Sequence, residues 1–182
     1  MRPAIDVHDS PAPGRAPTAT KIALVAALCI TAAITAAVVG RPELGPRDTA
    51  AYLLILSVLF LVRVAGQVAV VLRAPSWLPP MGQWHLMPYR LLLPIQIGFL
   101  ALMALIEIGF FRAWWSLVDR EPTFGRFLIG FSFVYAGAMV LRYAVRMHRR
   151  PGERWFGGAI PIVFHFVLAA FLFTLGKYHV AG

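Results

Sequence analysis

Five polar or charged side chains lie inside apolar stretches of the sequence, and their types are suited to binding an anion or a carbonyl group. Arg63 and Gln67 are separated by about one helical turn in the stretch LFLVRVAGQVAVVL. Each of the other three lies in a different apolar stretch: Gln96, Arg142 and His165. A guanidinium group binds phosphate or carboxylate through charged hydrogen bonds, and amide and imidazole groups can donate or accept. This set therefore predicts the binding of a polar head group.

The composition indicates a membrane protein. Of the 182 residues, 59% are hydrophobic and 14% are charged, whereas charged residues make up about 25% of soluble domains. The formal net charge is +9, but the basic residues lie between apolar runs and not on one solvated face, which argues against nucleic acid as a partner. The single cysteine, Cys29, excludes an intramolecular disulfide and a cysteine metal cluster. Arginine outnumbers lysine and alanine is abundant, which is typical of GC-rich bacteria, so we expect a multi-pass protein of the bacterial inner membrane.

Five apolar runs are long enough to cross the hydrocarbon core, which takes about 20 residues. Because backbone groups in lipid must be hydrogen-bonded within their own segment, each run is expected to be a helix. The predicted fold is an all-α integral membrane protein, in which residues 21–182 form a bundle of five transmembrane helices. Residues 1–20 are rich in Pro, Ala and small polar residues and are expected to form a disordered tail. The predicted spans cover about residues 22–40, 49–72, 91–111, 126–147 and 158–178.

The distribution of Lys and Arg near the ends of the spans predicts the orientation. If the N-terminus is cytoplasmic, more of these residues lie on the cytoplasmic side, and most of the excess comes from the cluster RYAVRMHRRPGER between the fourth and fifth spans. Short cytoplasmic loops are enriched in Lys and Arg. We therefore expect a cytoplasmic N-terminus and a C-terminus on the opposite side.

With this orientation, the five polar residues converge on the cytoplasmic half of the membrane. A rise of about 1.5 Å per residue places Arg63 and His165 at the same height, about 4 Å inward of the membrane centre. By the same rise, Gln96 and Arg142 lie about 8 Å inward, and Gln67 about 10 Å inward. The predicted site is a pocket formed by four helices and open to the cytoplasmic leaflet.

Three further residues are candidates for this pocket. Tyr135 is seven residues before Arg142, so both lie on one face of a helix. The loop SWLPPMGQWHLMPY is too rich in proline for one continuous helix, and it predicts an interfacial or re-entrant lid with Trp84 and His85 below the pocket mouth. In the alternative interpretation, this loop lies on the lipid head groups through its tryptophans.

Glu107 is the only acidic residue inside any predicted span. It falls about 9 Å to the outer side of the membrane centre, and we expect it to pair with Arg112, five residues later. Arg63 and Arg142 are then left without a carboxylate beside them. A charge near the membrane centre costs roughly 2.5–3.5 kcal/mol on insertion scales, so compensating partners are expected.

These patterns leave three functional interpretations open, and none decides whether the protein is an enzyme. In the first, the pocket binds an anionic lipid-like or quinone-like amphiphile. In the second, the polar residues only join helices, and the protein is a structural or assembly subunit whose Ala-rich first span packs on the bundle or on a partner membrane subunit. In the third, a redox subunit holds haem b between His85 and His165, because such a haem needs two histidines at matching depth.

Overall fold

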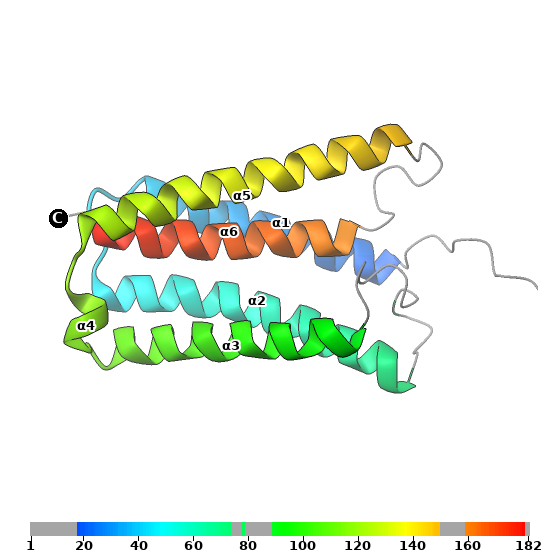
Figure 1. Ribbon diagram of the computed structural model, residues 1–182, viewed down its shortest axis with the longest axis horizontal. Coiled ribbons are helices and arrows are strands. Elements are labelled where there is room, and N and C mark those ends of the chain that lie inside the picture. Colours follow the sequence, from blue (N-terminus) through cyan, green and yellow to red (C-terminus); the bar gives the residue numbers. More distant parts are fainter. Residues whose placement is uncertain (1–17, 74–77, 79–88, 150–158, 181–182) are drawn as a thin grey trace, which may run out of the picture.

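The computed structural model describes residues 18–73, 78, 89–149 and 159–180. Every secondary-structure element within these ranges is a helix (Figure 1). Five of the helices are long, and a single turn, α4, lies between the third and fourth of them. The helices are α1 (Thr18–Val39), α2 (Pro46–Arg73), α3 (Tyr89–Phe111), α4 (Trp115–Val118), α5 (Pro122–Arg149) and α6 (Ala159–Val180).

The predicted fold class is confirmed, because α1, α2, α3, α5 and α6 are each long and apolar enough to cross a membrane. The boundaries differ by a few residues from those predicted. α1 begins at Thr18, inside the segment expected to be a tail, and the rest of that segment lies outside the described residues. α2 and α5 each begin a turn earlier than predicted, at Pro46 and Pro122, because proline is well tolerated at the first helical position. The chain is a multi-pass helical membrane protein.

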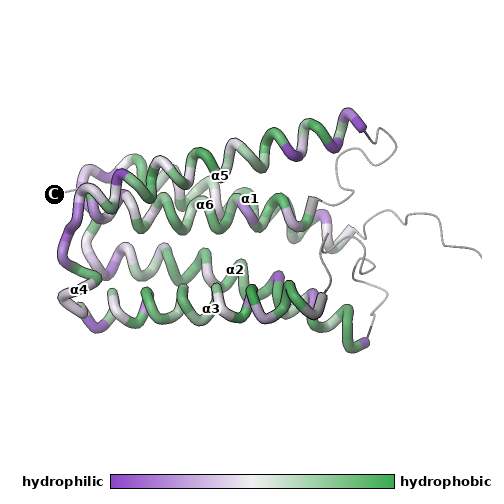
Figure 2. Tube along the Cα trace, viewed as in Figure 1, coloured by the Kyte–Doolittle hydropathy of each residue, from purple (hydrophilic) through white to green (hydrophobic). Residues whose placement is uncertain are grey.

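The outer surface of the bundle is apolar, as expected for helices in contact with acyl chains. Large hydrophobic side chains are exposed on every long helix except α6, among them Ile22, Val62, Leu91 and Phe133. A water-soluble monomer rarely exposes so much contiguous apolar surface. Figure 2 shows this apolar character along the long helices, with most hydrophilic residues near the two ends of the bundle.

α6 is the central helix of the bundle. It contacts α1, α2 and α5, whereas α3 packs mainly on α2. Val167 and Phe171 of α6 belong to the buried core. In Figure 1, α5 lies along one side of α6, and α2 and α3 lie along the other. α3 therefore packs mainly on α2, whereas α5 packs mainly on α6.

One face of α1 packs inside the chain, whereas most of the alanines of this helix are exposed. Its buried residues recur every three or four positions and so form one face, which packs mainly on α6. The hydroxyl groups of Thr31 and Thr35 donate to carbonyl oxygens one turn earlier, those of Ala27 and Thr31, at 2.7 and 2.9 Å. They therefore satisfy their hydrogen bonds within α1. The expected packing on the bundle is present, and packing on a partner subunit remains a prediction.

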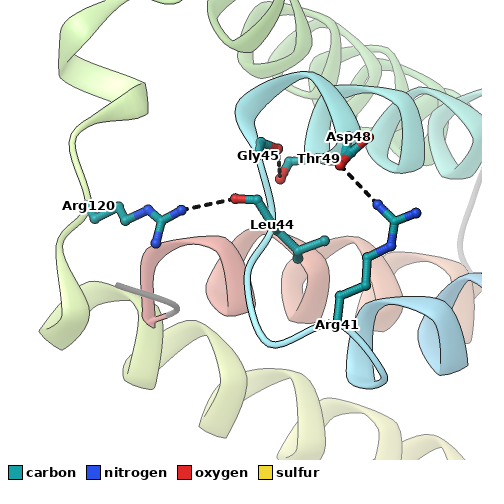
Figure 3. A network of polar contacts seen from close by, with 6 residues as sticks. All are labelled: Arg41, Leu44, Gly45, Asp48, Thr49 and Arg120. Atoms are coloured by element: carbon teal, nitrogen blue, oxygen red, sulfur yellow. Dashed lines mark hydrogen bonds and ion pairs between the residues drawn. The ribbon is translucent and has the colours of Figure 1, made fainter.

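Successive long helices alternate in direction, so the bundle has two distinct ends. We call the end where α2 and α5 begin the Asp48 end, and the end where α3 and α6 begin the Arg149 end. At the Asp48 end, one hydrogen bond joins the connection between α1 and α2 to the connection between α4 and α5 (Figure 3). Arg120 Nη2 donates to the carbonyl oxygen of Leu44 at 3.0 Å, and Arg41 forms an ion pair with Asp48 at 2.9 Å.

The last turn of α6 also holds this end together. The hydroxyl of Tyr178 donates to the carbonyl oxygen of Val118 at 2.7 Å. The backbone N–H of Glu121 donates to Nδ1 of His179 at 3.3 Å. The ring of Tyr178 packs edge-on against Phe110 with a centroid distance of 4.8 Å. The short helix α4, which the sequence pattern did not predict, is held between α3 and α6 by these contacts.

α5 and α6 approach most closely through two glycines near the Asp48 end. A Cβ added at Gly125 would lie 2.7 Å from the carbonyl oxygen of Gly176, and one added at Gly176 would lie 2.8 Å from that of Gly125. Small residues allow helix backbones to approach in this way. Toward the Arg149 end, α5 tilts away from α6 (Figure 1). The glycine contact thus fixes where the two helices meet and where they separate.

Gly125→Ala tests this close contact. We expect the variant to lose about 1–3 kcal/mol of stability, because overpacking forces the helices apart. The measurement is the midpoint of thermal unfolding in detergent micelles. Gly130→Ala on the same helix is the matched control, since nothing lies within 4 Å of a Cβ at Gly130. Equal midpoints for the two variants would contradict the role of the glycine contact.

The predicted orientation can be tested by cysteine labelling in a Cys29→Ala background. Arg112→Cys and Arg149→Cys introduce single thiols at opposite ends of the bundle. With a cytoplasmic N-terminus, a membrane-impermeant maleimide should label the Arg112→Cys variant in intact cells. It should label the Arg149→Cys variant only after permeabilisation. The reverse pattern would show that the orientation is wrong.

Candidate functional site

A cavity of about 390 Å³ lies among α2, α3, α5 and α6. Along α3 it extends from Leu92 to Ile106, and along α6 from Pro161 to Leu175. The wall, which is mostly apolar, is completed by Phe60 and Arg63 of α2 and by Phe131, Tyr135 and Arg142 of α5. Its volume is near the lower end of the range of about 300–1,000 Å³ that is typical of small-molecule sites.

Five of the residues predicted from the sequence line this one cavity. They come from four helices, and most of them lie nearer to the Arg149 end than to the Asp48 end, with Tyr135 at the middle of its helix. The structure therefore brings these five side chains to one cavity, and their role in binding stays a prediction. The five residues are Arg63, Gln96, Tyr135, Arg142 and His165.

The side chain of Arg63 is buried and forms a hydrogen bond with Gln67. It is only 6% exposed, and Nη1 donates to Oε1 of Gln67 at 3.2 Å. Gln67 is fully buried and is not among the residues that line the cavity. The guanidinium carbon of Arg63 also lies 6.0 Å from the centre of the Phe60 ring, at the outer limit of a cation–π contact. The geometry makes Gln67 a positioning residue for Arg63.

Tyr135 and His165 form a hydrogen-bonded pair between α5 and α6. The hydroxyl oxygen lies 3.0 Å from Nδ1 of the imidazole, and the rings meet at 62° with a centroid distance of 5.6 Å. This bond orients the imidazole and leaves Nε2 as its second hydrogen-bonding atom. Arg63 and Arg142 line the same cavity as the His165 ring. The imidazole and the two guanidinium groups therefore belong to one polar cluster.

Gln96 brings an unsatisfied polar atom to the same cavity. Its side chain is 4% exposed, and Oε1 is buried with no hydrogen-bond partner among the described residues. A buried acceptor left in this state costs about 1–3 kcal/mol. A bound molecule that donates a hydrogen bond would remove this cost. The amide is thus a candidate contact for a ligand.

Trp84 and His85 lie outside the described residues, so neither the predicted lid nor a haem site that uses His85 can be placed. Of the histidines that the structure describes, only His165 lines the cavity. Within the residues that the structure describes, no group of three or more His, Cys, Asp or Glu residues is arranged to hold a metal ion.

The predicted pairing of Glu107 with Arg112 is wrong. Glu107 is buried between α2 and α3, and its carboxylate accepts a hydrogen bond from the hydroxyl of Ser57, whereas Arg112 is exposed. Spacing along one helix suggested Arg112, but the carboxylate turns toward the neighbouring helix. Because α2 and α3 are antiparallel, Ser57 and Glu107 lie at similar heights, and comparing heights would have identified the pair. Glu107 is not among the residues that line the cavity.

A second cavity, of about 420 Å³, lies among α1, α2 and α6. Its lining is mostly apolar and includes four alanines, Ala19 and Ala23 from α1 and Ala65 and Ala69 from α2. Arg63 and Phe164 line both cavities. Arg63 therefore stands in the wall between them.

Gln67→Met tests the support of Arg63, since methionine keeps the volume and removes the acceptor. We expect a loss of about 1–3 kcal/mol, because a buried charged donor loses this partner. The measurement is the unfolding midpoint in detergent micelles. Val62→Met, at a position of the same helix that is 62% exposed, is the control and should leave the midpoint unchanged. If both variants unfold like the unsubstituted protein, Gln67 does not hold Arg63.

Comparison with known proteins assigns no function to this arrangement. No protein family matches the chain, and no curated protein or solved structure matches it. Helical bundles carry many unrelated functions, so function has to be argued from the site and not from the fold. Here, that site is the set of residues that line the cavity among α2, α3, α5 and α6.

Proposed function

We propose that this protein binds a lipid-like or quinone-like amphiphile in the cavity lined by α2, α3, α5 and α6. The polar head lies among Arg63, Arg142 and His165, and the hydrophobic chain follows α3 and α6. One observation carries the proposal: five polar side chains from four helices line a single cavity that is otherwise apolar. Such a combination of an apolar lining with a few convergent polar groups is typical of ligand sites.

The hydrogen bonds within the site favour a ligand over a network that only joins helices. The bond between Arg63 and Gln67 lies within α2, so it does not connect helices. The bond between Tyr135 and His165 joins α5 and α6. The amide of Gln96, however, has a buried Oε1 without a hydrogen-bond partner among the described residues. A network that only joins helices would be expected to satisfy such a buried acceptor.

The location of the site follows from the proposed orientation. With a cytoplasmic N-terminus, the Arg149 end lies at the cytoplasmic surface of a bacterial inner membrane, and the head group is bound in the cytoplasmic leaflet. The cavity lies inside the bundle, and its polar residues are within the length of the helices. The ligand is therefore drawn from the membrane and not from bulk water.

Arg63→Gln tests the proposal. Protein purified in a mild detergent should retain an amphiphile that mass spectrometry of the extracted small molecules detects. The variant should remain monodisperse and retain less than about a tenth of it, because loss of a charged hydrogen bond costs about 1.5–3 kcal/mol. Arg112→Gln removes an exposed arginine at the other end and should retain the normal amount. If Arg63→Gln retains as much as the unsubstituted protein and only loses stability, the site is a structural network.

The two other interpretations give different results in the same preparation. A haem subunit absorbs near the Soret band, so a colourless, fully folded sample would exclude it. An assembly subunit is unstable alone and recovers with its partner membrane protein. Most alanines of α1 are exposed and not packed within the chain, so a partner membrane subunit at that helix stays a prediction.

A further inference from the structure

We infer that the ligand is a single-chain amphiphile with an anionic head, a phosphate or a carboxylate, and that it enters the cavity sideways from the membrane. The inference rests on the proposed function and narrows it to one class of ligand. Three features of the cavity support it: the charge of its lining, its length and width, and the exposure of the residues at its rim.

The charge of the lining favours an anion. Two arginines, Arg63 and Arg142, line the cavity, and none of its described lining residues is acidic. Glu107, the acidic residue within α3, is engaged with Ser57 between α2 and α3. An anionic head would balance the two guanidinium groups and accept hydrogen bonds from them, which are the strong, charge-assisted kind. A neutral quinone supplies acceptors but no compensating charge.

The apolar part of the cavity matches one chain of one leaflet. From Gln96 to Ile106, α3 rises about 15 Å. This length is half of the hydrocarbon thickness of about 30 Å. Beyond the polar cluster, the described lining residues are apolar, among them Phe99 and Leu102 on α3 and Leu168, Phe171, Leu172 and Leu175 on α6.

The width of the cavity favours one chain over two. Its volume of about 390 Å³ is spread along α3 from Leu92 to Ile106, a distance of about 21 Å, so the cavity is elongated. A lipid with two chains would need to place the second chain outside this space. The second cavity lies on the other side of Arg63 and Phe164, so it does not widen the first.

The rim of the cavity gives access from the membrane. Ile95, Phe99 and Leu102 on α3 line the cavity, and yet they are 49%, 47% and 53% exposed. On α5, Phe131 lines the cavity and is 47% exposed. Both helices belong to the lipid-facing surface, and α3 packs mainly on α2 while α5 packs mainly on α6. The cavity therefore opens sideways between α3 and α5.

The test is a titration of the full-length protein in detergent micelles, followed by native mass spectrometry. The probes are hexadecyl phosphate, hexadecanoate, hexadecanol, dihexadecyl phosphate and a short-chain ubiquinone. We expect hexadecyl phosphate or hexadecanoate to bind at least about tenfold more tightly than hexadecanol, dihexadecyl phosphate or the quinone. The better of the two single-chain anions identifies the head group as a phosphate or a carboxylate.

Variants separate the contributions of charge and shape. Arg142→Gln should weaken binding of the anion about tenfold and leave binding of hexadecanol unchanged. Arg112→Gln should change neither. Leu172→Trp fills the apolar part of the cavity and should abolish binding of every probe. Should Arg142→Gln not fold, Arg142→Lys keeps the charge and should retain most of the affinity for the anion.

The outcomes distinguish failure of this inference from failure of the proposed function. Equal binding of hexadecanol or the quinone, lost in Leu172→Trp, would overturn the anionic head while the binding site remains. Equal binding of dihexadecyl phosphate would overturn the single chain. If none of the probes binds, or if Leu172→Trp has no effect, both the inference and the proposed function are wrong.

Discussion

The absence of water in the membrane interior is the constraint on which this structure depends. It forces the backbone into long helices, because hydrogen bonds within a segment are the only partners available there. It also makes each polar side chain in the interior costly unless that side chain finds a partner in the protein or in a ligand. The apolar outer surface and the few polar residues inside follow from this one condition.

Packing around α6 turns five separate helices into one bundle with unequal ends. At the Asp48 end, Gly125 and Gly176 bring α5 and α6 together. Arg120 and Tyr178 donate hydrogen bonds to Leu44 and Val118 there, and His179 accepts one from the backbone of Glu121. Toward the Arg149 end, α5 tilts away (Figure 1). This difference allows space to remain between α5 and α3 while the bundle stays intact.

The polar residues have distinct tasks within that space. Gln67 accepts a hydrogen bond from Arg63 and so positions its guanidinium group, and Tyr135 orients the imidazole of His165 through a hydrogen bond. Arg63, Arg142 and Gln96 then present charge and hydrogen-bonding groups to a cavity whose other walls are apolar. An amphiphile matches this division, since one end of the molecule is polar and the other is not.

The sequence by itself determined the number of long apolar helices and their approximate limits. These properties follow from the hydropathy and rise of each segment, which are local. Only the tertiary structure decided that Glu107 meets Ser57, that α4 forms beside Tyr178, and that Gln67 lies behind the cavity lining and not in it. These results depend on which helices are neighbours and how each is rotated about its axis. Packing between distant segments sets both quantities, and no single segment contains that information.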